Sequence, residues 1–276
     1  ADWLVDGMIS AGDLAAPARE DRMTRVDVFG VQTDALKFEQ ALATLSAWAL
    51  DADGRRYVCT CPVYTLMMCR ERPDVMAAVN RADMVTADGM PIVWMQRRLG
   101  QADAERVYGP DVMYSLCSAG DPAVRHFFWG GLPGVNEQLA SALRAQNPAL
   151  QIAGMVSPPV APVEGTPDPE VVARLNDSGA SIIWVGLGSP KQDLWMATYR
   201  PVLTAPLLIG VGAAFDMLAG VKAQAPRWMQ RAGLEWLFRL LQEPGRLGKR
   251  YLIYNPRFIA LVLRQLWAER QSSRQK

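Results

Sequence analysis

The sequence has few of the residues from which metal centres and nucleophilic hydrolases are built. It holds four cysteines and one histidine among 276 residues. Cys59, Cys61 and Cys69 lie close together, but no C-x-x-C pair is present, and a fourth zinc ligand would have to be Cys117 or His126. We therefore expect buried free thiols in a reducing compartment. His126 lies within the apolar run RHFFW, and without a G-x-S-x-G motif we expect it to be structural.

Long apolar runs are also missing from the sequence. The segment PVLTAPLLIGVGAAF is too short to span a bilayer and is broken by Pro and Gly, so we expect any membrane contact to be peripheral. The N-terminus has no basic segment followed by an apolar core, and residues 1–22 are expected to form a loose leader. These features predict a cytoplasmic protein.

Net charge is only +1, but the charges are unevenly distributed. Residues 222–276 hold 12 Lys and Arg against 3 Asp and Glu, which leaves 17 basic and 25 acidic residues elsewhere. Aromatic residues are interleaved with these cations, namely Trp228, Trp236, Tyr251, Tyr254, Phe258 and Trp267. This mixture favours a surface for anionic phospholipid and diphosphate groups over a nucleic-acid surface or a solvated face, and no nucleic-acid partner is expected.

Short apolar runs alternate with helical patterns along most of the chain. Strands are expected at 25–31, 57–61, 84–89, 125–131, 150–158, 181–188 and 206–212, and helices at 36–50, 63–78, 135–145, 169–176 and 191–199. Strict alternation predicts an α/β, Rossmann-like fold with a mainly parallel sheet covered by helices on both faces. We assign this domain to residues 23–220.

Only helical patterns follow, so residues 221–276 are expected to form a basic, amphipathic helical appendage that associates with membranes. Pro244 should end one helix or start the next, and Pro256 should open the last one. Arg239, Arg246 and Arg250 share a helical face only if the break at Pro244 leaves the register roughly intact.

The first candidate for chemistry is Asp88, which follows the apolar run VTA and precedes Gly89. A carboxylate at the end of a parallel strand is well placed to act as a general base.

GLGSPK is a defective dinucleotide motif, because Lys191 replaces its third glycine. Either a phosphate-binding turn capped by Ser189 or a plain turn fits this segment. Asp51 and Asp53 form a D-x-D, which we expect to belong to a turn before a strand and not to a metal site. No essential metal or other cofactor is predicted.

Five segments in order, TADG, ERVYGPDV, VGLGSPKQD, GVGAAFDMLAG and, after an Ala-Pro, GLEWLFRLLQEPGRLGKRY, resemble the WecG/TagA/CpsF family of bacterial glycosyltransferases, glycosyltransferase family 26. The resemblance runs from about Met23 to the end of the chain. It implies an inverting enzyme with a membrane-contacting appendage that completes the active site. The implied reaction moves a hexose or N-acetylhexosamine from a UDP-sugar to a polyprenyl-diphosphate-linked sugar in cell-surface polysaccharide synthesis, without a metal.

The resemblance also assigns roles to residues. Asp88 corresponds to the proposed base, while Thr60, Arg106 and Gln192 match positions that line the sugar-nucleotide pocket. The appendage cations Arg239, Arg246 and Lys249 or Arg250 are expected to reach the donor diphosphate. Further substrate-site residues are expected from the same motifs, namely Gly89, Gly109, Asp111, Gly188, Gly212 and Asp216.

Two positions depart from the family pattern. The family's T-x-N would place an asparagine at position 62, where this chain has Pro62, and its R-A-P is here Gln224-Ala225-Pro226. The donor sugar therefore stays open, with ManNAc and glucose as alternatives, as does the oligomeric state, with a homo-oligomer as one alternative. Two other functions also stay open: a membrane- or polyanion-binding module with a vestigial pocket and, ranked below it, a nucleotide-dependent oxidoreductase.

Overall fold

The computed structural model describes residues 23–118, 121–159, 163 and 165–274, so the expected leader lies outside it. An eight-stranded sheet forms the centre, in the order β1-β2-β4-β3-β8-β7-β5-β6. Every pairing is parallel except that of β1 with β2. The strands are β1 Thr24–Val28, β2 Val31–Ala35, β3 Arg56–Cys61, β4 Met84–Ala87, β5 Arg125–Gly130, β6 Gln151–Val156, β7 Ile182–Gly186 and β8 Leu207–Gly210.

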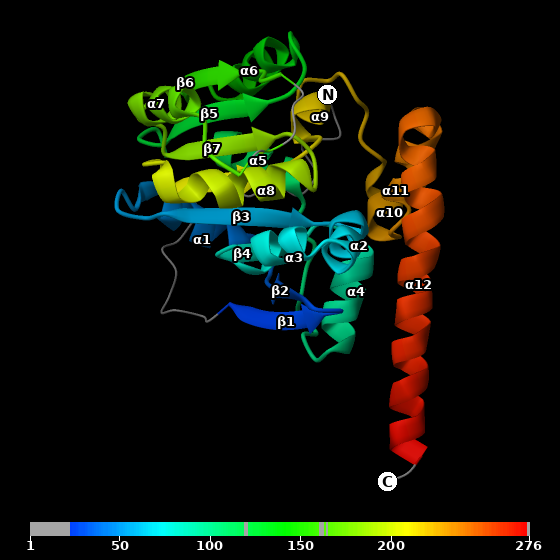
Figure 1. Cartoon of the computed structure of the whole chain (residues 1–276). Coiled ribbons are helices and arrows are strands. Elements are labelled where there is room, and N and C mark those ends of the chain that lie inside the picture. Colours follow the sequence, from blue (N-terminus) through cyan, green and yellow to red (C-terminus); the bar gives the residue numbers. More distant parts are fainter. Residues whose placement is uncertain (1–22, 119–120, 160–162, 164, 275–276) are drawn as a thin grey trace.

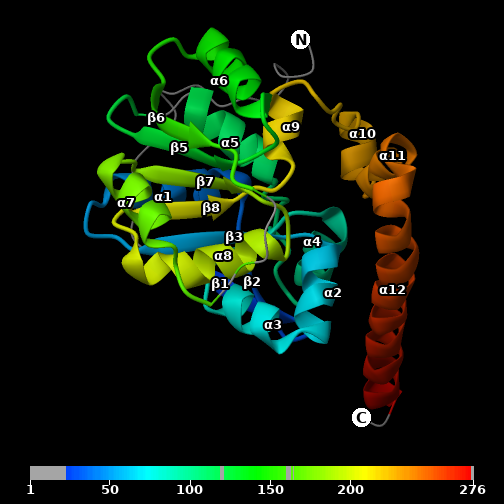
Figure 2. The same cartoon turned by 45° about the horizontal axis from the view of Figure 1, so that its top comes forward.

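Helices cover both faces of the sheet, as the alternation predicted (Figures 1 and 2). One hydrophobic cluster joins the sheet to α2, α3, α7 and α8, and a second joins it to α1, α5, α6 and α9. The helices of this body are α1 Phe38–Leu50, α2 Val63–Glu71, α3 Pro73–Asn80, α4 Met90–Arg98, α5 Gly109–Ser118, α6 Val135–Gln146, α7 Pro169–Asp177, α8 Lys191–Tyr199 and α9 Ala214–Leu218. The predicted α/β fold is confirmed.

Two predicted elements of the N-terminal half were wrong in detail. The run expected as one strand is a hairpin, because Phe29 and Gly30 have φ values of 56° and 94° and form a two-residue turn between β1 and β2. The helix expected at 63–78 is two helices, since Pro73 starts α3 directly after α2 has ended.

The appendage consists of α10 Arg227–Arg231, α11 Glu235–Gln242 and α12 Pro244–Arg274, and α12 stands alongside the α/β body (Figure 1). The prediction that Pro256 opens a helix was wrong, because Pro256 lies inside α12. The backbone hydrogen bond that proline forfeits is the one to the carbonyl of Leu252, and both residues are exposed, so water can replace it. Among the described residues, none of the helices combines the length and the apolar composition that a membrane span requires.

The α12 helix packs on α2 and on the turn after β1. The ring of Phe258 meets that of Phe29 edge-on, with 5.9 Å between centroids. On the neighbouring turn of α12, the Tyr254 hydroxyl donates to Glu71 at 3.0 Å, and Arg257 forms an ion pair with the same carboxylate. The helix is therefore fixed to the body by an aromatic contact and by polar contacts to Glu71.

The four cysteines and the single histidine all lie in the interior of the protein. All four cysteines are free and buried, as predicted. His126 is buried, its Nδ1 accepts a hydrogen bond from the Trp184 indole at 3.0 Å, and burial lowers its pKa to about 4. This confirms that His126 is structural.

Candidate active site

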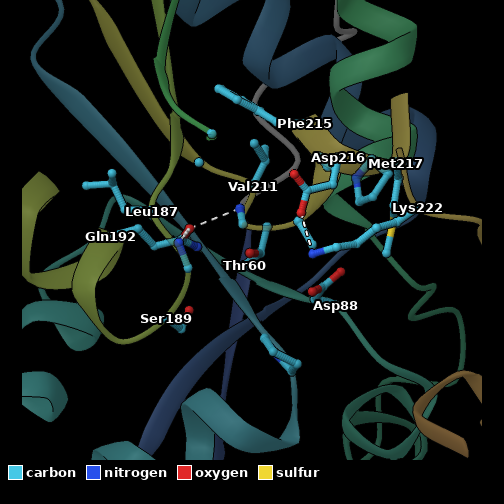
Figure 3. A pocket seen from close by; sticks show the side chains of 18 of the residues that line it. Thr60, Asp88, Leu187, Ser189, Gln192, Val211, Phe215, Asp216, Met217 and Lys222 are labelled. Carbon is cyan, nitrogen blue, oxygen red and sulfur yellow. Dashed lines mark hydrogen bonds and ion pairs between the residues drawn. The ribbon is translucent and has the colours of Figure 1, made fainter. Parts of the chain in front are cut away.

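A cavity of about 520 Å³ opens at the carboxyl edge of the sheet, where β3, β4, β7 and β8 end. We call it the polar cavity. Figure 3 shows Thr60, Asp88, Asp216 and Lys222 around it. The predicted residues that line it are Thr60, Asp88, Gly188, Gln192, Gly212, Asp216, Arg239, Arg246 and Arg250. Parallel strands bring these distant segments together because their carboxyl ends meet at one edge.

Asp88 sits between the end of β4 and the start of α4. Its Oδ1 accepts a hydrogen bond from the Gly109 N–H at 3.2 Å, and its backbone carbonyl accepts one from Arg106 Nε at 3.0 Å. Burial raises the pKa of Asp88 to about 7; the Arg106 and Arg239 charges oppose this rise, and that of Glu235 adds to it. A carboxyl that titrates near neutrality and faces a cavity is suited to accept a proton from a substrate hydroxyl.

Thr60 and Gln192 connect the loops that form the polar cavity. The Thr60 hydroxyl donates to the carbonyl of Gly210 at 2.9 Å, which joins β3 to β8. The Gln192 Oε1 accepts from the N–H of Gly188 at 3.2 Å and from that of Gly212 at 2.9 Å. These bonds fix the loops after β7 and β8 relative to each other. The N–H of Gly188 is thereby already hydrogen-bonded. The N-cap of α8 is Pro190, so the prediction that Ser189 caps this helix is wrong.

Cations from the appendage and the loops face the polar cavity, namely Lys191, Lys222, Arg239, Arg246 and Arg250, against the carboxylates Asp88, Asp216 and Glu243. Arg250 lies over the ring of Tyr64, with 3.6 Å from its Cζ to the ring centroid. Its Nε is buried and has no hydrogen-bond partner among the described residues. Burial lowers the pKa of Arg250 to about 10, because its charge is desolvated. A half-buried guanidinium whose Nε has no partner is suited to an anionic ligand.

A chain of ion pairs joins the body to the appendage across the polar cavity. Lys222 Nζ lies 2.6 Å from Asp216 Oδ2 in α9 and 3.1 Å from Glu243 Oε1 at the end of α11. Arg246 pairs with Glu243. The sequence analysis missed Lys222 and Glu243, since only their position across the cavity distinguishes them from surface charges.

A second contact joins the appendage to the body beside Asp88. The Glu235 carboxylate pairs with Arg106 and accepts a hydrogen bond from the Tyr108 hydroxyl at 2.8 Å. Arg106 also donates to the Gln230 side chain at 3.0 Å. The side chains of Arg106 and Glu235 are only 13% and 14% exposed. Arg106 therefore connects Asp88 to the appendage, an arrangement that no local motif indicated.

A family model described as the glycosyl transferase WecG/TagA/CpsF family matches residues 26–272, which is nearly the whole chain. The chain belongs to this family. Membership makes it a glycosyltransferase of cell-surface polysaccharide synthesis, with a sugar-nucleotide donor and a lipid-linked acceptor. The cavity with a carboxylate and several cations is in keeping with that chemistry.

Other predicted site residues lie outside the polar cavity. Gly89 and Arg106 line a second cavity between α4 and the appendage. Gly109 donates to Asp88 and packs against Val211, where an added Cβ would lie 3.3 Å from the Val211 carbonyl oxygen. Asp111 forms an ion pair with Arg227 of α10 at 2.9 Å.

Lys249 is exposed and lines neither of the two cavities described here. Asp51 pairs with Arg56 at 2.7 Å in the turn before β3, at the opposite edge of the sheet from Asp88. The D-x-D therefore has the turn role that the sequence favoured. No group of three potential metal ligands occurs among the described residues.

The two departures from the family pattern have different surroundings. Pro62 lines both cavities and directly precedes α2, so the missing asparagine would have faced the candidate site. Gln224 lines neither cavity, and its Oε1 is buried without a partner in the described part of the chain. Pro62 is thus the departure with the more direct bearing on substrate contacts.

Proposed function

We propose that this family member is an inverting, metal-independent enzyme that transfers ManNAc or glucose from a UDP-sugar to a polyprenyl-diphosphate-linked sugar. The observation that carries the proposal is Asp88, a carboxyl with a pKa of about 7 in the lining of a cavity rich in cations. Such a pair of features suits a reaction that removes a proton from one substrate and expels a diphosphate from another. Exopolysaccharide assembly is one setting for it.

In this mechanism Asp88 accepts the proton of the acceptor hydroxyl as its oxygen attacks the anomeric carbon of the donor. The bond from that carbon to the diphosphate oxygen breaks, and UDP leaves with the bonding electron pair. One displacement inverts the anomeric configuration. Gly109 and Arg106 hold Asp88 through the two hydrogen bonds described above.

Arg239, Arg246 and Arg250 stabilise the departing diphosphate. Arg250 is the strongest candidate of the three for binding a phosphate oxygen. Its buried Nε has no partner among the described residues, and its guanidinium lies on the ring of Tyr64. Arginine matches phosphate oxygens with paired donors, so these side chains can supply the charge that a metal provides in other transferases. Lys249 is exposed and contributes to the general positive charge.

The protein acts as a peripheral enzyme at the inner face of the plasma membrane. Support comes from large apolar side chains exposed on the appendage, which are Trp228, Leu241, Leu252, Ile259, Leu263 and Trp267. Together with the local excess of Lys and Arg, they suit contact with anionic lipid. We accordingly propose residues 221–276 as a functional unit that completes a transferase domain at 23–220.

A membrane-binding module with an inactive pocket is the second candidate, because the same exposed face would suffice for it and Pro62 replaces a polar residue. The deciding experiment measures UDP release from UDP-ManNAc, UDP-GlcNAc and UDP-glucose with synthetic polyprenyl-diphosphate-GlcNAc or -glucose as acceptor. We expect acceptor-dependent release from one donor. No release from any donor, with intact binding to anionic vesicles, would favour the binding module, and binding of NAD(H) in place of UDP would favour an oxidoreductase.

A further inference from the structure

A second cavity, of about 470 Å³, lies between α4 and the appendage. We call it the apolar groove. Its α4 side is formed by Met90, Pro91, Trp94 and Met95. Its opposite side is formed by the α10–α11 turn and by α12 residues Tyr251, Asn255, Phe258, Ile259, Val262 and Leu263.

The α12 residues of the groove recur at helical spacing and therefore share one face of the helix. From Tyr251 to Leu263 this face extends roughly 18 Å at 1.5 Å per residue. Phe258 is 6% exposed, whereas Ile259 and Leu263 are 55% and 59% exposed. The groove thus has a covered base and an open apolar rim, which is the shape required by a slender apolar chain that enters from one side.

The groove is continuous with the candidate active site. Pro62, Asp88, Arg239 and Arg250 line both cavities. The junction therefore combines the candidate base with two guanidinium groups, and the apolar wall continues from it along α12. A molecule with a sugar hydroxyl near one end and a long hydrocarbon tail at the other matches this order of surfaces.

We propose that the apolar groove binds the first isoprene units of the acceptor's polyprenyl chain and places the acceptor's sugar hydroxyl at Asp88, while Arg239 and Arg250 at the junction remain with the donor's diphosphate. This inference rests on the proposed function and adds the location of the lipid. Acyl chains of the bilayer are the competing occupant, but they carry no hydroxyl that would use the base at the groove's inner end.

Binding in the groove can be separated from membrane contact in general. Leu252 is 71% exposed on the same helix and does not line the groove. It serves as the control for the double variant Ile259→Ala/Leu263→Ala. Both variants remove exposed apolar carbons from α12, so both should fold and both should weaken vesicle binding slightly.

The experiment compares two acceptors with the same sugar diphosphate, one carrying a long polyprenyl chain and one carrying a single isoprene unit. Each buried methylene contributes a factor of roughly 4 to binding, so partial loss of two side chains should raise KM for the long acceptor about 10-fold. We expect an unchanged kcat, a KM for the short acceptor close to wild type, and little effect of Leu252→Ala on either acceptor.

An equal rise in KM for both acceptors, or an equal effect of the Leu252→Ala control, would overturn the groove as the chain's binding site. An unaltered KM for the long acceptor in the double variant would do the same. Absence of transfer to either acceptor by the wild-type protein would instead refute the proposed function. The two failures are therefore distinguishable.

Discussion

Glu235→Gln tests how the appendage influences the candidate base. Glu235 pairs with Arg106, and Arg106 holds the backbone of Asp88 at 3.0 Å. The negative charge of Glu235 raises the pKa of Asp88, and the charge of Arg106 lowers it. Glutamine keeps much of the shape and removes the charge, so Arg106 acts on Asp88 without compensation and the pKa of Asp88 should fall.

The size of the expected effect follows from the pH at which kcat/KM declines on the acidic side of its pH profile. Asp88 must be ionised to accept a proton, so kcat/KM declines as the pH falls through its pKa of about 7. Loss of one nearby charge should lower this pKa by about one unit. At pH 6 the ionised fraction would then rise from ~9% to ~50%, and the variant would retain ~5-fold more of its own maximal kcat/KM than wild type does.

The assay is a pH profile of kcat/KM between pH 5 and 9. Glu71→Gln is the matched control, because Glu71 also fixes the appendage, through Tyr254 and Arg257, and its charge is not among those that shift the pKa of Asp88. That variant should leave the acidic limb in place even if it lowers the maximum. The reasoning would be refuted if the acidic decline of kcat/KM in Glu235→Gln stayed near pH 7, or if it shifted equally in both variants.

Two further predictions concern the diphosphate site and the fold. Arg250→Gln should lower kcat about 10²–10³-fold, because it removes a charged donor at the leaving group. The control Lys249→Gln changes an exposed residue and should alter kcat less than 2-fold. Equal effects of the two variants in steady-state kinetics would show that the assignment is wrong. Gly130→Ala should cost about 3 kcal/mol or more of unfolding free energy, since Gly130 has a φ of 138° and an added Cβ would lie 2.5 Å from the Gly186 carbonyl carbon. Gly134→Ala, at a φ of 85° with no atom within 4 Å, should cost only about 1 kcal/mol, and similar urea midpoints for the two variants would contradict this account.

Most of the sheet was predictable from the sequence because its strands are short apolar runs separated by helical patterns. The same regularity places Thr60, Asp88, Gln192 and Gly212 together, as carboxyl ends of parallel strands share one edge. The hairpin at Phe29 was missed since a bulky residue with positive φ gives no turn signal. The continuous α12 was missed because Pro256 normally breaks a helix, whereas packing on α2 preserves this one.

The contacts between body and appendage were beyond sequence reasoning. Glu235 meets Arg106 across 129 positions, and nothing in the local pattern of either residue specifies the other. Lys222 likewise becomes part of the polar cavity only because Asp216 and Glu243 converge on it. Such long-range pairs depend on how two packed units meet, which periodicity and motif spacing do not encode.

The most direct test of the proposed mechanism is acceptor-dependent UDP release by Asp88→Asn, with donor affinity measured on the same protein by calorimetry. The account predicts a fall in turnover of at least about 10²-fold, because the amide cannot accept the proton, while donor affinity stays within about 2-fold of wild type. Asp51→Asn, in the turn at the opposite edge of the sheet, should retain full activity. Wild-type turnover in Asp88→Asn would contradict the central claim that Asp88 is the base.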